Sequence, residues 1–101
     1  MFGKKQKLGL EPPDLATHRD AVEILRVWVM PEWEQMQVAL HPHHPDPSVW
    51  GIALVDIARH AAKAYALDQG MSEDQALLRI KQVFDAEWSV PTELPEGRLR
   101  D

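Results

Sequence analysis

The sequence predicts an α+β fold in which an antiparallel β-hairpin is followed by two α-helices packed on one face of it. Three observations support this prediction. Residues 23–30 are rich in β-branched and aromatic side chains, and residues 35–41 alternate between apolar and polar. Asp46 and Pro47 form a helix-start pair before a long amphipathic segment. Ser72 opens a capping box before a second amphipathic segment.

The two predicted strands are joined by a four-residue turn, 31–34, and this turn length sets their register. Side chains alternate across a strand, so every second residue shares one face. We expect one face, here called the aliphatic hairpin face, to consist of Leu25, Val27 and Val29 opposite Leu40, Val38 and Met36. The other, here called the outer hairpin face, carries Ile24, Arg26, Trp28 and Met30 beside Gln35, Gln37, Ala39 and His41.

The first predicted helix covers residues 47–69 and ends at Gly70, a residue that readily adopts the left-handed conformation of a helix terminus. The second covers residues 73–88, with Gln75 completing the capping box of Ser72. At about 100° per residue, each segment shows one apolar stripe. The stripes consist of Trp50, Ala53, Leu54, Ile57, Ala58, Ala61, Ala64 and Tyr65, and of Ala76, Leu77, Ile80, Val83, Phe84 and Trp88.

The 101 residues are sufficient for one domain. Residues 1–20 contain glycines, a Pro-Pro pair and no sustained period, which predicts a mobile N-terminal arm. Residues 21–91 form the predicted ββαα domain, and residues 92–101 a disordered C-terminal tail.

Composition excludes several classes of function. The formal net charge of -5 argues against nucleic-acid binding, which requires clustered basic residues. There is no cysteine for a disulfide or a thiolate metal site, and no apolar run long enough to span a membrane. No glycine-rich phosphate loop or nucleophile motif indicates a cofactor or a catalytic residue. We expect a cytoplasmic protein.

The loop after the hairpin carries His41, His43 and His44 close to Asp46, residue types that can bind a first-row metal ion. However, the loop lacks the regular ligand spacing of zinc motifs, and its prolines restrict its geometry. A solvated loop is therefore favoured over a metal site.

Asp56, Arg59 and His60 have helical spacings of three and four and can therefore interact. A carboxylate that orients an imidazole is one part of general acid–base catalysis, and these residues form a possible ligand face. A surface ion-pair network is the favoured interpretation, since no nucleophile stands nearby in the sequence.

Trp28 is the tryptophan without an evident role in the core. Trp50 and Trp88 lie on the apolar stripes of the helices, and Trp33 lies in the turn. Arg26, Trp28 and Met30 together resemble the anchors of protein interfaces, where tryptophan and arginine are enriched. The outer hairpin face is thus the candidate interaction surface, unless the N-terminal arm covers Trp28 in the same chain.

Three segments, residues 22–29, 50–60 and 84–88, together resemble a family of small bacterial proteins that is described as a domain of unknown function. The resemblance covers roughly residues 21–91. It implies a bacterial origin and a self-contained domain, and it brings no activity or site residues with it.

Two functions follow from these observations. The first is a non-enzymatic protein-interaction module that self-associates as a homodimer, or binds a protein partner, through the outer hairpin face. The alternative is a small-molecule binder or enzyme that uses Asp56, Arg59 and His60.

Overall fold

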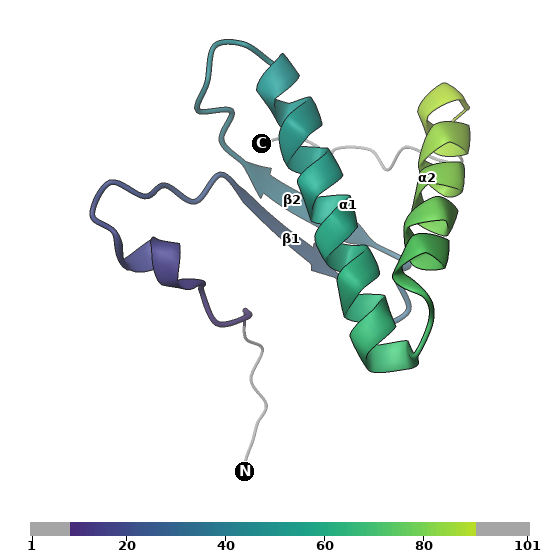
Figure 1. The fold of residues 1–101 in the computed structure, drawn as a ribbon. Helices are drawn as coiled ribbons and strands as arrows, with labels where there is room; N and C mark the ends of the chain where they lie inside the picture. Colours follow the sequence, from purple (N-terminus) through teal and green to yellow (C-terminus); the bar gives the residue numbers. More distant parts are fainter. Residues whose placement is uncertain (1–8, 91–101) are drawn as a thin grey trace.

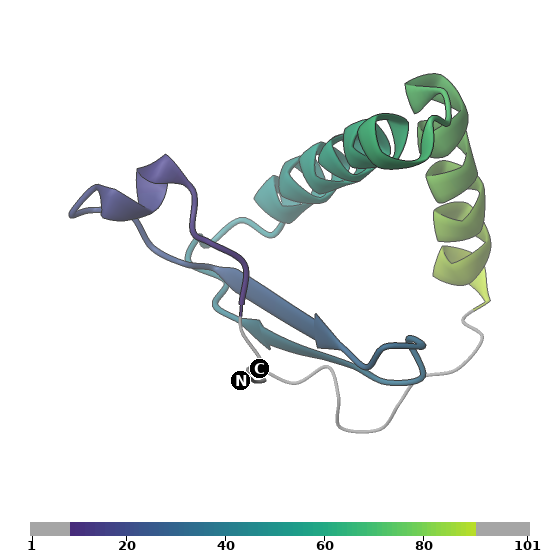
Figure 2. The same ribbon diagram turned by 90° about the horizontal axis from the view of Figure 1, so that it is seen from below.

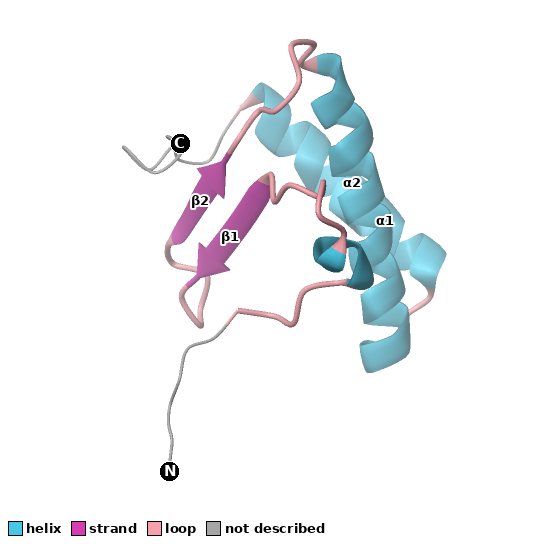
Figure 3. Ribbon diagram, turned by 90° about the vertical axis from the view of Figure 1, so that its left-hand side faces the viewer, coloured by secondary structure: helices cyan, strands magenta, loops and turns pink. Residues whose placement is uncertain are grey.

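The computed structural model describes residues 9–90 (Figure 1). It contains a short 3₁₀ helix η1 (Asp14–Thr17), strands β1 (Leu25–Val29) and β2 (Met36–Leu40), and helices α1 (Ser48–Gln69) and α2 (Glu73–Ser89). The predicted α+β class and the order of hairpin and two helices are confirmed. Both helices lie on the same side of the hairpin (Figures 2 and 3). Residues 1–8 of the predicted arm, residue 91 of the predicted domain and the whole predicted tail, residues 92–101, lie outside the described residues.

The hairpin has the predicted register. Leu25 pairs with Leu40, Val27 with Val38 and Val29 with Met36. The pairing extends beyond the strands, because the His41 N–H donates to the Ile24 carbonyl at 2.9 Å and the Met30 N–H to the Gln35 carbonyl at 3.2 Å. The turn closes through Trp33, whose backbone adopts a φ of 63° and whose N–H donates to the Met30 carbonyl.

Helix α1 begins and ends at the predicted signals. The Asp46 Oδ1 accepts the Ser48 N–H at 3.0 Å, and Pro47 already has helical dihedral angles, so the aspartate caps the first turn. Gly70 ends the helix with a φ of 72°, in the left-handed region. Ser72 then caps α2, where its Oγ accepts the Gln75 N–H at 3.2 Å.

The two helices run antiparallel and contact each other near the loop that joins them. Ala62 of α1 is fully buried and Ala76 of α2 is 3% exposed, so the small side chains let the backbones approach closely. Half-buried residues extend this seam: Ala58, Ala61 and Ala66 on α1, and Leu77 and Ile80 on α2. Away from the loop the helices diverge (Figures 1 and 2).

Both helices lie on the predicted side of the hairpin, but they do not approach its strands closely within the single chain. No Cα of either strand comes within 8 Å of a Cα of α1 or α2. The linker 41–47 accounts for this separation: three prolines stiffen it, and the Trp50 indole N–H holds it by donating to the Pro42 carbonyl at 3.1 Å. The hairpin is therefore held at a distance from the helices.

Trp88 likewise differs from its predicted place in the core. Its side chain stacks on Phe84, with ring centroids 5.5 Å apart, yet the residue is 75% exposed. It lies in the last turns of α2, where the helices have diverged and α1 offers no surface to cover it (Figure 2).

Among residues 9–90, no helix combines the length and the apolar character needed to cross a membrane.

Candidate interaction surface

The outer hairpin face presents two large apolar side chains on one strand. Trp28 and Met30 are two positions apart along β1 and its end, so they project to the same side of the sheet. They are 44% and 46% exposed. The described part of the predicted arm is itself highly exposed at Leu10 and Leu15, so it does not bury its apolar residues on this face.

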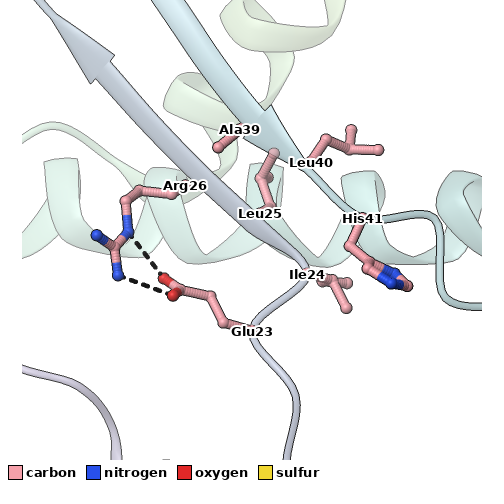
Figure 4. Close-up of a pocket in the computed structure, with 7 residues that line it drawn as sticks. All are labelled: Glu23, Ile24, Leu25, Arg26, Ala39, Leu40 and His41. Atoms are coloured by element: carbon pink, nitrogen blue, oxygen red, sulfur yellow. Dashed lines mark hydrogen bonds and ion pairs between the residues drawn. The ribbon is translucent and has the colours of Figure 1, made fainter. Parts of the chain in front are cut away.

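Arg26, on the same face, forms an exposed ion pair with Glu23. Its Nη2 donates to Glu23 Oε1 at 2.8 Å and its Nε to Glu23 Oε2 at 3.1 Å, which makes a bidentate pair (Figure 4). These hydrogen bonds, together with the charge of Glu23, raise the pKa of the guanidinium further above its usual range. The sequence reasoning missed Glu23, because residues three apart in an extended strand point to opposite faces, so the spacing gave no signal for this pair.

An open hollow of about 430 Å³ lies at the end of the hairpin where β1 begins and β2 ends. Its lining residues come from both strands and their ends: Glu23, Ile24, Leu25, Arg26, Ala39, Leu40 and His41 (Figure 4). Because Leu25 and Leu40 belong to the aliphatic hairpin face and Arg26 and Ala39 to the outer one, the hollow spans both faces.

The histidine loop is organised by local hydrogen bonds. The rings of His41 and His43 meet edge to face, 5.5 Å apart, and His44 Nδ1 accepts the Asp46 N–H at 3.0 Å. The hydrogen bonds that Asp46 accepts from Ser48 lower the pKa of its carboxyl group. Across residues 9–90, no three His, Asp or Glu side chains are grouped so that they could hold a metal ion.

Asp56 and His60 interact on the surface of α1. The His60 Nδ1 lies 2.9 Å from the Asp56 carbonyl oxygen and 3.9 Å from the carboxylate Oδ2, and both side chains are more than 70% exposed. Neither these two residues nor Arg59 lines the hollow at the hairpin end or a second one, of about 240 Å³, under the histidine loop. The structure does not enclose the predicted ligand face.

The sequence analysis also missed that the aliphatic hairpin face is open. Val27, Val29, Met36 and Leu40 are all between 37% and 46% exposed, about as much as Trp28. Their alternating pattern correctly predicted a shared face, but a pattern does not reveal whether another layer covers that face.

These features define a small ββαα protein whose apolar hairpin and helix surfaces lack a covering layer within the described chain. Residues 10–92 match the family described as Domain of unknown function (DUF5076), and the chain belongs to that family. The predicted membership of a family of unknown function is thereby confirmed.

A solved structure supports the same fold. It is described as "a putative pyruvate dehydrogenase from the photosynthetic bacterium Rhodopseudomonas palustrus CGA009". It is 40% identical, with a TM-score of 0.70, and the alignment covers 100% of both chains. A comparison with curated proteins gave no match.

Proposed function

We propose that this chain is a non-enzymatic protein-interaction module that self-associates, with the outer hairpin face as one contact surface. The observation that carries this proposal is the exposed hairpin: within residues 9–90, no Cα of β1 or β2 lies within 8 Å of a Cα of a helix, and most of the apolar residues of the strands are more than a third exposed. A two-stranded hairpin is marginally stable by itself and requires a further layer. A second protein chain would supply that layer.

The chemistry of the outer hairpin face suits a protein contact. Interface cores are enriched in tryptophan, methionine and arginine and depleted of unpaired charge. Trp28 and Met30 supply the apolar anchors, and Glu23 neutralises Arg26 through the bidentate pair. A contacting chain can therefore cover this face without leaving the guanidinium unpaired.

The size of this face limits its part in the assembly. A fully exposed large apolar residue offers about 150–250 Å², so Trp28 and Met30, each somewhat under half exposed, present roughly 180 Å². A standard interface buries about 800 Å² on each partner. The outer hairpin face thus supports a supplementary or weak contact, and a stable association needs more surface.

The bacterial source of the 40% identical neighbour supports a bacterial origin for this chain. The absence of cysteine from the sequence is consistent with a cytoplasmic location, which we include in the proposal.

The mass in solution tests this function, measured by light scattering behind gel filtration over a range of concentrations. We expect Trp28→Ala to shift association to higher concentration while the far-ultraviolet circular dichroism remains that of the folded domain. Trp33→Ala is the matched control, because Trp33 is exposed in the turn and belongs to neither strand. Equal association of all three proteins would refute a role for Trp28, and a monomer at every concentration would refute self-association.

A further inference from the structure

The described chain leaves two sets of apolar side chains without cover. The first is the aliphatic hairpin face. The second lies on the helices beyond their seam and is here called the open helix surface. It consists of Leu54, Ile57 and Tyr65 on α1, and of Val83, Phe84 and Trp88 on α2, which are 41% to 75% exposed.

Helix geometry explains why the seam does not cover the open helix surface. At about 100° per residue, Leu54, Ile57 and Tyr65 lie roughly a quarter turn around α1 from Ala58, Ala62 and Ala66. On α2, the residues Val83, Phe84 and Trp88 continue the stripe of Ala76 and Ile80, but the helices have diverged at that level (Figures 1 and 2). Both groups are thus apolar helix faces of the kind that normally pack on a sheet.

The same chain is poorly placed to close its hairpin onto its own helices. The linker between them contains Pro42, Pro45 and Pro47, which restrict its backbone. Three further interactions hold it at the start of α1: the hydrogen bond from Trp50 to Pro42, that from Asp46 to His44, and the cap of Ser48 by Asp46. This arrangement favours cover by another molecule.

The uncovered area is of the size that a stable dimer needs. At about 150–250 Å² for a fully exposed large apolar residue, the open helix surface and the four exposed residues of the aliphatic hairpin face present on the order of 900 Å². A standard interface takes about 800 Å² from each partner.

We infer that a second copy of this chain supplies the cover: in a two-fold symmetric dimer, the aliphatic hairpin face of each protomer packs on the open helix surface of its partner. This inference rests on the proposed self-association and identifies its main interface. A second copy is the occupant favoured by the structure, because each chain leaves open both an apolar sheet face and apolar helix faces, and together these reach the area of a standard interface. In a two-fold symmetric dimer, both contacts between a hairpin face and a helix surface form at once. Two-fold symmetry is also the usual symmetry of homodimers.

Charged substitutions test the interface by light scattering. We expect Val27→Asp on the hairpin and Ile57→Asp on α1 each to give a particle of half the wild-type mass. Leu78→Asp is the control, because Leu78 is 58% exposed on the opposite side of α2 from the stripe, and this variant should remain dimeric. Helical circular dichroism shows whether each variant is folded.

Cross-linking makes the test independent of folding defects. The chain has no cysteine, so Val27→Cys and Phe84→Cys chains can be mixed, allowed to exchange, and joined by a flexible bismaleimide. We expect a hetero-linked product of twice the chain mass, and no such product when Leu78→Cys replaces Phe84→Cys, because Leu78 lies on the opposite side of α2.

The outcomes separate the two proposals. A wild-type monomer at all concentrations overturns both of them. A dimer that Trp28→Ala dissociates, but that Val27→Asp and Ile57→Asp leave intact, overturns the inference and retains the proposed function. A double variant, Val27→Cys with Phe84→Cys, that links only within one chain also overturns the inference, because the chain then covers its own hairpin.

Discussion

The alanine seam between the helices makes a quantitative prediction about stability. Ala62 is fully buried in α1 and faces α2 in the region where Ala76 is 3% exposed. Ala62→Leu adds three carbon atoms where the two backbones approach closely, and overpacking of this kind costs about 1–3 kcal/mol. Leucine has nearly the helix propensity of alanine, so the helix itself is not weakened. For a domain of this size, 1 kcal/mol lowers Tm by about 4–8 °C, so we expect a fall of roughly 5–20 °C.

Thermal unfolding followed by circular dichroism measures this effect. The protein concentration must be equal in all samples, because Tm depends on concentration if the chain self-associates. Ala86→Leu is the matched control: it makes the same change at an exposed position of α2, away from the apolar stripe of that helix. If Ala62→Leu unfolds at the same temperature as Ala86→Leu, the seam is not closely packed and the reasoning fails.

Two capping contacts give further predictions. Ser72→Ala removes the acceptor for the Gln75 N–H and should lower the free energy of unfolding by about 1 kcal/mol, measured by urea unfolding; an unchanged midpoint would contradict the cap. Asp46 has a lowered pKa because it accepts hydrogen bonds from Ser48. Its cap therefore contributes fully above the ordinary aspartate pKa of about 3.9 and is lost as the pH falls through the lower folded value. Asp46→Asn, measured at neutral and strongly acidic pH, should lose less stability on acidification than the wild type, and equal losses would oppose this assignment.

Local features of the chain were predictable because their causes are local. The alternation in residues 35–41 and the length of the turn determine the hairpin register, since a slip of one residue would exchange the two faces. Asp46, Gly70 and Ser72 mark the helix ends, because each satisfies backbone groups only a few residues away. The same holds for the pair of Asp56 and His60, one helical turn apart.

The candidate surface was predictable only in part. Sequence reasoning selected Arg26, Trp28 and Met30 from their position on the outer hairpin face, and the structure places Trp28 and Met30 side by side and half exposed. It did not predict that the aliphatic hairpin face and Trp88 are exposed as well. An apolar stripe shows that a residue requires cover, but the stripe is the same whether that cover comes from its own chain or from another.

The sequence by itself determined the elements of this protein: their order, their ends and the residues that share each face. These depend on hydrogen bonds and side-chain periods that span a few residues. Only the tertiary structure decided how the elements stand to one another, because that arrangement depends on the linker 41–47 and on the angle between α1 and α2. The linker holds the hairpin away from the helices, and the helices diverge beyond Ala62 and Ala76. The apolar surfaces that the sequence encodes are consequently left exposed within residues 9–90.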